Sequence, residues 1–415
     1  MKQIKVGIFG TGKRGLSLFA NLMKLNCEIT AICDSQPERL EEANRALGGT
    51  AAVYTDFEAF LNHGLDAVIL ANYFHEHAPY AIRCFEKGIH VFSECLSNGT
   101  MAEGVALIRA FEKSSSIYMM AENYPQMKFN REMKRLCDGG TLGRILYAEG
   151  EYNHPGDPND ISFKKQYNYF EHHWRNFAPR SYYITHSLGP LMHATGATPR
   201  RVTAFNVYAP VEGDVPIATR VGDQASIITM QNDDGSVFRV TGCAAFGAHH
   251  NAYRICGTNG QIENLRGLGE KVMLRYNRWA VPQDAQEINF YEPEWNDRDE
   301  TFISESGHGG SDYLTVRMFV ECIRQGKQPE HPFDIYGAVN MASVGILAHR
   351  SMLAGGQPID IPDFREEAAR KQYENDWDSP FYCTDGRTPT IPCCSHPDHA
   401  PTQSQIKLYK KSLGL

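Results

Sequence analysis

Three closely spaced glycines near the start of the chain could support phosphate binding. Gly10, Gly12 and Gly15 follow a short apolar run in a Gly-x-Gly-x-x-Gly pattern, and Lys13 and Arg14 stand inside it. A glycine has no Cβ, so a pyrophosphate can approach the backbone N–H groups of such a turn where a helix begins. The pattern therefore predicts a dinucleotide-binding turn.

An acidic residue stands where a bound dinucleotide would need one. The largely apolar residues 28–33 predict a second strand, and Asp34 ends it. A carboxylate at this end of the second strand accepts hydrogen bonds from an adenosine ribose and repels a 2′-phosphate. The sequence therefore favours NAD over NADP as the cofactor.

Alternating strands and helices would position these residues. Apolar runs predict strands at 5–9, 28–33, 66–70, 90–93 and 118–121, with helices at 76–87 and 101–113 among them. Such alternation is typical of a parallel sheet covered on both faces. We therefore expect an α/β fold whose N-terminal domain, residues 1–122, is a doubly wound Rossmann domain that binds NAD.

The pattern changes beyond residue 147. Longer β-rich runs separated by turn residues occur at 201–209, 224–230, 237–245, 252–257 and 271–276, which is typical of antiparallel strands. Helical patterns at 311–325 and 335–354 are expected to pack on one face of this second sheet. Residues 123–362 are thus predicted to form an α+β domain with a large open, mostly antiparallel sheet, residues 154–180 a loop over the site, and residues 363–415 a tail that wraps the surface.

The composition narrows the class of protein. The 415 residues carry a formal charge of −8, 42% of them are hydrophobic, and no run of Lys and Arg is longer than a pair. Such a chain lacks the positive patch that nucleic acid or an anionic membrane would require, so a small-molecule ligand is favoured. Eleven irregularly spaced cysteines, and no leader-like or membrane-spanning apolar stretch, predict a reduced, cytoplasmic protein.

Two further segments carry a family resemblance. Residues 71–78, Ala-Asn-Tyr-Phe-His-Glu-His-Ala, and residues 90–96, His-Val-Phe-Ser-Glu-Cys-Leu, resemble the Thr-Pro-Asn-x-x-His and Glu-Lys-Pro signatures of the glucose-fructose oxidoreductase/inositol dehydrogenase/MocA family. The resemblance implies a Rossmann domain, a bound nicotinamide cofactor, a carbohydrate-like substrate, and homo-oligomers formed through the sheet of the second domain. It adds four residues to the predicted cofactor site: Asn72, His77, Glu94 and Asn123.

One departure from the family bears on the reaction. Cys95 stands at the lysine of Glu-Lys-Pro, and a thiol cannot supply the cation that helps to deprotonate a substrate hydroxyl. The family's Asp and His, four residues apart in the second domain, are also replaced, since one alignment puts His186 and Pro190 there. Ordinary polyol dehydrogenation is therefore disfavoured.

Within this family the chain most resembles glycoside hydrolase family 109, the NAD-dependent glycosidases. The similar segments are Met-Ala-Glu-Asn (120–123), Glu-Tyr-Asn-His (151–154), Trp-Arg (174–175), Tyr-Ile-Thr-His-Ser-Leu-Gly-Pro (183–190) and Gly-His-Gly-Gly-Ser-Asp-Tyr (307–313). The resemblance implies catalytic roles for Glu122, Tyr152, His154, Tyr183 and His186, and substrate contacts for Trp174, Arg175 and His308. Departures at Cys95, Ile184 and Ser187 indicate a neighbouring group with a different substrate.

The resemblance implies a cycle in which tightly bound NAD removes hydride from C3 of a glycoside, the ketone acidifies the C2 proton, elimination expels the aglycone, water adds, and the hydride is returned. We expect His186, with Tyr183, to take the C3 hydroxyl proton and Tyr152 to take the C2 proton. His154 would orient the sugar, and Glu122 would be the acid or a hydroxyl anchor. Two alternatives stay open: a net dehydrogenase that leaves the 3-keto glycoside to a partner enzyme, and a non-catalytic nucleotide-sensing protein.

Each of these residues also has a structural interpretation. A single Tyr or His near a strand end is usually a packing residue, and only the coincidence of five favours a site. The loop aromatics Tyr167, Tyr169, Phe170 and Trp174 could stack on a sugar or form a packed lid. A tail cluster could hold structural zinc, but its spacing fits no standard ligand pattern, so reduced thiols are favoured. That cluster comprises Cys383, Cys393, Cys394, His396 and His399.

Overall fold

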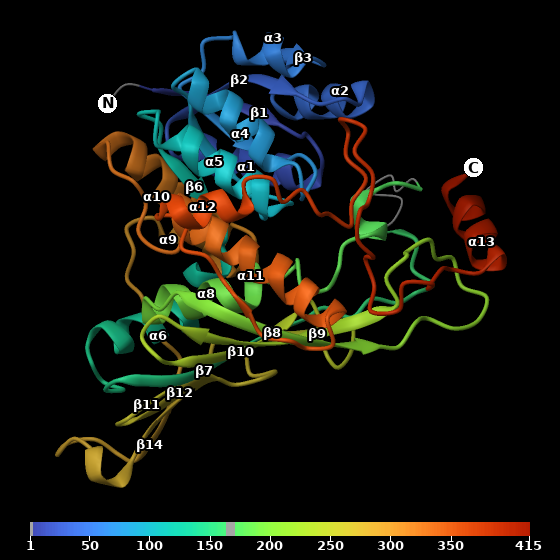
Figure 1. The fold of residues 1–415 in the computed structure, drawn as a ribbon. Helices are drawn as coiled ribbons and strands as arrows, with labels where there is room; N and C mark the ends of the chain where they lie inside the picture. Colours follow the sequence, from blue (N-terminus) through green and yellow to red (C-terminus); the bar gives the residue numbers. More distant parts are fainter. Residues whose placement is uncertain (1–2, 163–170) are drawn as a thin grey trace. The chain divides into compact units, whose positions relative to one another are not determined.

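The computed structural model describes residues 3–162 and 171–415, and the chain forms two compact units (Figure 1). Unit 1 comprises residues 1–126, 296–339 and 364–377, and unit 2 comprises residues 127–295, 340–363 and 378–415. Each unit is therefore assembled from segments that are far apart in the sequence. The domain boundaries expected at residues 122 and 362 stay predictions.

A six-stranded parallel sheet, counted over the described residues, forms the centre of unit 1. Strands β1 to β6 are Ile4–Phe9, Cys27–Cys33, Ala52–Tyr54, Ala67–Leu70, His90–Ser93 and Tyr118–Met120, in the spatial order β3-β2-β1-β4-β5-β6. The strands are short and largely apolar because a parallel sheet is buried between helices. The predicted doubly wound Rossmann sheet is confirmed, and β3 is the strand without a predicted counterpart.

Some helices of unit 1 connect these strands, and others come from later segments of the chain. They are α1 (Lys13–Lys24), α2 (Pro37–Ala46), α3 (Phe57–Leu61), α4 (His77–Glu86), α5 (Met101–Phe111), α9 (Glu300–Ser304), α10 (Ser311–Gln325) and α12 (Glu367–Tyr373), while α11 (Ile335–Leu353) runs from unit 1 into unit 2. In the described part of the chain, no helix combines the length and the apolar character that crossing a bilayer requires.

Helix α10 packs in unit 1 and not on the second sheet. Its Phe319 lies 5.1 Å from Phe92 of β5, measured between ring centroids, and belongs to the apolar core around β1 and β2. Arg324 Nη2 donates a hydrogen bond of 2.6 Å to Leu25 O at the end of α1. The expectation that residues 311–325 would cover the second sheet is therefore wrong. An amphipathic pattern shows that a helix has a buried face, but it does not show which sheet receives that face.

A nine-stranded sheet, again counted over the described residues, forms the centre of unit 2. Its strands are β7 (Ile145–Asn153), β8 (Pro199–Tyr208), β9 (Asp223–Asn232), β10 (Val237–Gly242), β11 (His250–Gly257), β12 (Gly260–Asn264), β13 (Val272–Tyr276), β14 (Ile288–Tyr291) and β15 (Ile359–Asp360). The spatial order is β14-β13-β12-β11-β7-β10-β9-β8-β15, and among these nine described strands only β7 and β10 pair in parallel. The predicted open, mostly antiparallel sheet is confirmed.

Two helices, α6 (Lys128–Asp138) and α8 (Thr185–Thr195), lie on one face of this sheet (Figure 1). The contact between β7 and α8 requires a glycine at residue 150. A Cβ on Gly150 of β7 would lie only 2.0 Å from Ser187 O of α8. Side chains two residues apart on a strand share one face, so Tyr152 is directed to the side of β7 on which α8 packs. The first turn of α8 and the end of β7 are therefore neighbours.

The C-terminal residues are divided between the two units. In unit 1, Arg370 Nη1 of α12 donates a 2.6 Å hydrogen bond to Glu112 Oε2. In unit 2, the fully buried His349 donates from Nε2 to Pro392 O at 2.7 Å. The chain then ends with helix α13 (Gln403–Leu413).

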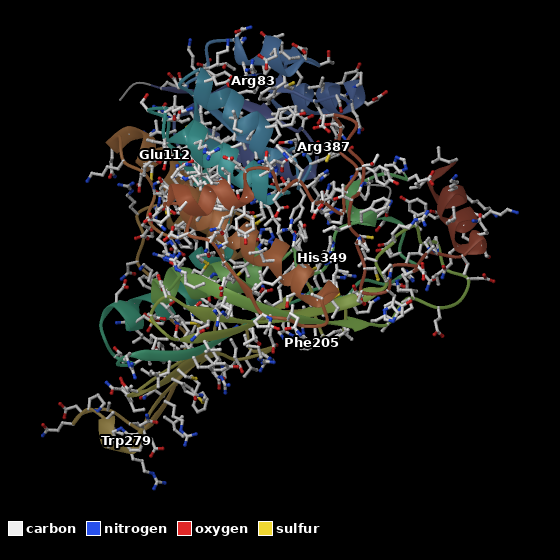
Figure 2. All side chains as sticks on the ribbon, viewed as in Figure 1. Arg83, Glu112, Phe205, Trp279, His349 and Arg387 are labelled. Carbon is white, nitrogen blue, oxygen red and sulfur yellow. The ribbon has the colours of Figure 1, made fainter. Side chains whose placement is uncertain are left out.

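Unit 2 exposes aromatic side chains at the β13–β14 end of its sheet. Trp279 is 82% exposed and Phe290 of β14 is 64% exposed, and Figure 2 shows Trp279 at the tip of this end. Large apolar side chains in water are candidates for contacts with other molecules. Homo-oligomers formed through this sheet stay a prediction.

Candidate functional site

The glycine turn of unit 1 has the geometry that a pyrophosphate site needs. Gly10 has a φ of +93°, and a Cβ there would lie 2.4 Å from Ala71 O. A Cβ on Gly15 would lie 2.1 Å from Gly10 O, whereas a Cβ on Gly12 would be 3.6 Å from the nearest atom, Arg39 Nη1. The three glycines thus supply a tight turn, an open approach to the backbone and a close helix–strand contact. The turn therefore suits a dinucleotide such as NAD, whose pyrophosphate would be held at the start of α1.

Asp34 holds the glycine turn in place. Its Oδ2 accepts hydrogen bonds from Thr11 N (2.7 Å) and Thr11 Oγ1 (3.1 Å), and its Oδ1 accepts one from Gln36 N (3.0 Å). A carboxylate offers about four acceptor positions, so Asp34 keeps capacity for a ribose hydroxyl. Its selection of NAD over NADP stays a prediction.

The other predicted cofactor residues follow the carboxyl ends of the parallel strands. Asn72 follows β4, Glu94 follows β5 and Asn123 follows β6, so all three lie at the edge of the sheet where the glycine turn lies. His77 begins α4 and is 1% exposed, and its Nδ1 donates to Leu96 O at 2.6 Å. Burial lowers the pKa of His77 to about 4. His77 is therefore neutral at pH 7 and ties α4 to the segment after β5.

A buried acid connects three of the predicted residues. Asp312 Oδ1 accepts hydrogen bonds from Arg14 Nη1 (3.0 Å) and Asn123 Nδ2 (2.7 Å). Its Oδ2 lies 2.9 Å from Nδ1 of His308, and Arg14 also donates from Nε to Glu94 at 2.6 Å. Burial opposes the ionisation of Asp312, but His308 and Arg14 outweigh it and lower the pKa of this carboxyl.

The sequence contains a signal for Asp312 that the predicted site did not use. His308 and Asp312 stand four residues apart in the Gly-His-Gly-Gly-Ser-Asp segment at the start of α10. Residues at this spacing are neighbours where a helix begins. The family resemblance implies a substrate contact for His308, and the structure places both His308 and Asp312 in unit 1, with Asp312 paired to Arg14.

Glu122, the predicted acid or hydroxyl anchor, lies at the end of β6 and is fully buried. Its Oε1 accepts a hydrogen bond from Tyr124 N (3.1 Å), and its Oε2 accepts one from Cys95 Sγ (3.4 Å). The thiol at the family's lysine position is thus a neutral donor to this carboxylate. Glu122 belongs to unit 1, as His308 does, and the structure does not group either with the predicted residues of unit 2.

Glycines also fix the segment that leads into α8. A Cβ on Gly242 of β10 would lie 2.3 Å from Arg180 O, and one on Gly345 of α11 would lie 2.9 Å from Ser181 O. The backbone at residues 180–181 is therefore packed tightly between the sheet and α11. Two predicted catalytic residues follow directly, one just before α8 and one in its first turn, so their positions are set by this packing.

Four of the five predicted catalytic side chains come together in unit 2. The ring centroid of Tyr152 lies 4.9 Å from that of His186 and 5.7 Å from that of His154. The Tyr183 ring lies 5.9 Å from Tyr152 and 5.4 Å from His186. Tyr152 is only 6% exposed. A strand and a helix start thus bring two phenols and two imidazoles into one cluster, which we call the Tyr/His cluster.

A third imidazole, which the sequence patterns do not single out, borders the Tyr/His cluster. The His249 ring lies 4.7 Å from that of His154, in the loop before β11, where no periodicity marks it. Burial lowers the pKa of His154, and the charges of His249, His186 and Arg175 lower it further because they disfavour another cation nearby. His154 is therefore neutral at pH 7 and can accept a hydrogen bond from a hydroxyl group.

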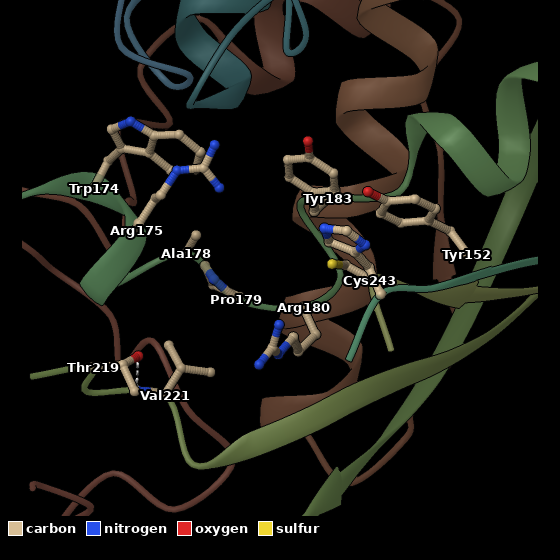
Figure 3. A pocket seen from close by; sticks show the side chains of 11 residues that line it. Tyr152, Trp174, Arg175, Ala178, Pro179, Arg180, Tyr183, Thr219, Val221 and Cys243 are labelled. Atoms are coloured by element: carbon tan, nitrogen blue, oxygen red, sulfur yellow. Dashed lines mark hydrogen bonds between the residues drawn. The ribbon is translucent and has the colours of Figure 1, made fainter. Parts of the chain in front are cut away.

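A cavity of about 260 Å³ adjoins the Tyr/His cluster (Figure 3). Its lining residues are Tyr152, His154, Trp174, Arg175, Ala178, Pro179, Arg180, Tyr183, Thr219, Val221 and Cys243. Figure 3 shows Trp174 and Arg175 on one side and Tyr152 and Tyr183 on the other. His186 is not among the lining residues and contacts the cavity wall through the two tyrosines. The cavity has the mixture of aromatic and polar groups that small-ligand sites need.

The predicted substrate residues Trp174 and Arg175 lie together at this cavity. The guanidinium carbon of Arg175 is 4.3 Å from the ring centroid of Trp174, which is 9% exposed. The other loop aromatics singled out in the sequence, Tyr167, Tyr169 and Phe170, lie outside the described residues.

The cysteine and histidine side chains of the tail cluster bind different partners. Cys394 Sγ accepts from Gly222 N at 3.3 Å, and Cys393 Sγ donates to Arg220 O at 3.6 Å. Burial raises the pKa of Cys393 to about 12, so this thiol is protonated in the absence of a metal. Among the described residues, no three of the five tail candidates bring their ligand atoms together. This geometry does not support a zinc site.

Two family models match different segments of the chain. Residues 4–122 match the oxidoreductase family, NAD-binding Rossmann fold, and residues 221–371 match the glycosyl hydrolase 109, C-terminal domain. A glycosyl hydrolase family 109 protein of Streptomyces filamentosus is 26% identical over 87% of this chain and 77% of its own. One from Stenotrophomonas maltophilia (strain K279a) is 23% identical over 93% of both chains.

Solved structures share the architecture. A levoglucosan dehydrogenase in complex with NADH and L-sorbose is 20% identical, with a TM-score of 0.70 over 88% of this chain and all of the other. At this identity the likeness concerns the fold. The same pairing of a parallel sheet and a large open sheet is therefore found in enzymes that bind a nicotinamide cofactor.

Proposed function

This chain belongs to the glucose-fructose oxidoreductase/inositol dehydrogenase/MocA family, close to glycosyl hydrolase family 109, and we propose that it hydrolyses a glycoside through oxidation at C3. As a member of this family it is an NAD-dependent enzyme of the oxidoreductase type. The proposal concerns the net reaction and the residues that perform it.

The Tyr/His cluster beside the cavity is the observation that carries the proposal. A simple dehydrogenase needs one group that takes a proton from the reacting hydroxyl, whereas elimination needs a second group for C2. Tyr152 and His186 have ring centroids 4.9 Å apart, and Tyr183 contacts both. Unit 2 therefore offers several proton-transfer groups at one wall, more than a sensing protein would need.

Each proposed catalytic residue would carry out a separate proton transfer in the reaction. NAD⁺, when bound, accepts two electrons and a hydrogen nucleus from C3 and returns them at the end of the cycle. His186, acting with Tyr183, takes the proton of the C3 hydroxyl as the C3 carbonyl forms. Tyr152 takes the C2 proton, so that the electrons of the C2–H bond form a C1=C2 double bond while the C1–O bond breaks. Water then adds, with its hydroxyl going to C1 and a proton returning to C2.

Two further residues would bind the sugar or assist the leaving group. His154, kept neutral by its surroundings, can accept a hydrogen bond from a sugar hydroxyl. Glu122 is the proposed acid or hydroxyl anchor, and the Cys95 thiol that donates to it is the group beside it in unit 1. A proton on Glu122 would be needed when the aglycone departs.

An aryl glycoside with less than one equivalent of NAD tests the proposal. We expect many molecules of phenol to be released per NAD, with no lasting absorbance of reduced cofactor. In deuterated water, the sugar product should carry deuterium at C2, because elimination exchanges that proton. One turnover per NAD with lasting absorbance would instead show a net dehydrogenase that makes a 3-keto glycoside. No turnover with any glycoside would favour a sensing protein.

A further inference from the structure

The permanently charged side chains that line the cavity of unit 2 are all positive. Arg175 and Arg180 both line it, and His154 adds an imidazole. Among the described residues that line the cavity, none is Asp or Glu. A guanidinium that has no acidic partner costs desolvation when an uncharged ligand displaces water from it, and an anionic ligand would offset this cost.

Arg180 is held at the cavity wall by a hydrogen bond to a backbone carbonyl. Its Nε donates to the backbone oxygen of Asp223 at 2.9 Å. The Asp223 carboxylate is occupied elsewhere, since Ser395 N (2.9 Å) and Asn206 Nδ2 (2.8 Å) donate to Oδ2 and Ser395 Oγ donates to Oδ1. Among the described residues, no carboxylate forms an ion pair with Arg180. The guanidinium is thus held by a neutral carbonyl oxygen at the cavity wall.

The two guanidinium groups act on the same part of the cavity. Figure 3 shows Arg180 and Cys243 close to each other, with Arg175 and Trp174 on another side of the same space. Burial raises the pKa of the Cys243 thiol, while Arg180 and Arg175 both oppose this rise by favouring the thiolate. A ligand group near Cys243 therefore feels both positive charges.

We propose that this cavity selects a glycoside whose sugar ring carries a carboxylate, a hexuronoside, and that Arg180 binds this carboxylate with the support of Arg175. The proposal rests on the proposed function, because it names the substrate class of the same site. A guanidinium is planar and presents paired N–H groups that match the two oxygens of a carboxylate. The cation in the cavity would then be neutralised by the substrate.

Paired substrates test the selectivity of the NAD-loaded enzyme. We would compare 4-nitrophenyl glucuronides and galacturonides with the 4-nitrophenyl glucosides and galactosides of the same anomeric configuration. We expect kcat/KM to be about 10-fold or more higher for the best uronoside than for its hexoside, because a charged hydrogen-bonded pair is gained. A hexoside preferred to its uronoside would overturn the inference. A 4-carboxyphenyl hexoside preferred to the uronosides would also overturn it, since the carboxylate would then belong to the aglycone.

Variants connect the preference to Arg180. In Arg180→Gln the uronoside-to-hexoside ratio of kcat/KM should fall by about 10-fold, and in Arg180→Lys by less, because an ammonium keeps the charge without the paired donors. Arg201→Gln is the matched control, since Arg201 pairs with Asp360 on the surface of unit 2. A ratio that does not change in Arg180→Gln would contradict the assignment.

Binding measurements separate this inference from the proposed reaction. If no glycoside is turned over, the proposed function fails, and titration calorimetry with glucuronate, galacturonate, glucose and galactose still tests the cavity. We expect at least one uronate to bind about 10-fold or more tightly than its hexose and to lose this advantage in Arg180→Gln. Uronates that bind no better than hexoses would overturn the inference.

Discussion

The cofactor edge of unit 1 and the cavity of unit 2 differ in whether their arginine side chains form ion pairs. At the cofactor edge, Arg14 is paired with both Glu94 and Asp312, and the acid is held ionised. In the cavity, Arg180 has no acidic partner among the described residues, and His154 is held neutral. A network of fixed charges positions a ligand, whereas groups that can gain or lose a proton perform chemistry. We therefore propose that the cofactor edge of unit 1 binds NAD and that the Tyr/His cluster of unit 2 carries out the proton transfers at C3 and C2, with Glu122 of unit 1 as the proposed acid.

Removing His186 should have the largest effect and tests the assignment of chemistry to unit 2. In His186→Ala we expect the rate of C3 oxidation to fall by about 1,000-fold, because general-base catalysis contributes roughly this factor. NAD affinity should stay near that of the parent protein. Single-turnover measurement of cofactor reduction gives the rate, and fluorescence titration gives the affinity.

His250→Ala is the matched control for that variant. His250 lies on the neighbouring strand, and its Nε2 bonds Glu151 at 3.1 Å, away from the Tyr/His cluster. Its loss should lower the rate by far less. Hydride transfer at the normal rate in His186→Ala would remove His186 from the mechanism.

Removing Asp312 should break the fixed-charge network of unit 1. We expect Asp312→Asn to lower the free energy of unfolding by about 3 kcal/mol, because Arg14 loses one of its two acidic partners and His308 loses its carboxylate. Since folding lowers the pKa of Asp312, its contribution is complete above about pH 4, the ordinary carboxyl value, and is lost as the pH falls further. Urea unfolding at several pH values measures both effects.

The exposed pair of Lys24 and Glu305 provides the comparison for Asp312. Glu305→Gln should cost less than about 0.5 kcal/mol, because water screens a surface pair. If the two variants lost the same stability, or if the loss in Asp312→Asn grew as the pH was lowered, the network would not be a fixed-charge support.

Two glycine variants should separate binding from folding within the cofactor turn. In Gly15→Ala the new Cβ would meet Gly10 O at 2.1 Å, so we expect unfolding to become easier by about 2 kcal/mol. In Gly12→Ala the nearest atom is 3.6 Å away, so stability should hold while NAD binds about 10-fold more weakly, because the methyl group keeps the pyrophosphate off the backbone. Thermal unfolding and NAD titration measure the two effects. Equal NAD affinity in Gly12→Ala and the parent would argue against this approach to the backbone.

The smallest expected effect concerns the pKa of His154. His249 lowers this pKa both by its charge and by covering the ring. His249→Ala should therefore raise the pKa of His154, so that protonation begins at a higher pH and the acid limb of the kcat/KM profile moves upward. NMR titration of the His154 ring measures this directly, with His396→Ala, at a ring stacked on Tyr208, as the control. A lower pKa in His249→Ala would contradict this account of the cavity.

The parts that local sequence determines are those whose residues are neighbours in the chain. Gly10, Gly12 and Gly15 form their turn with the strand and helix that flank them, so the Rossmann sheet and its cofactor edge can be predicted from spacing and periodicity alone. The pairing of Tyr152, on β7, with His154, directly after β7, follows from alternation in the same way. The resemblance to known families supplied the other half of the Tyr/His cluster.

Only the tertiary structure decided which distant residues meet. Asp312 reaches Arg14 across 298 positions of sequence, and α10 joins unit 1 because its apolar face fits there, which its own pattern does not reveal. Arg180 reaches the cavity wall because Gly242 lets its backbone lie against β10. The periodicity of a segment indicates which of its faces is buried. The element that packs against that face is decided by the shape and charge of surfaces that exist only after the chain has folded.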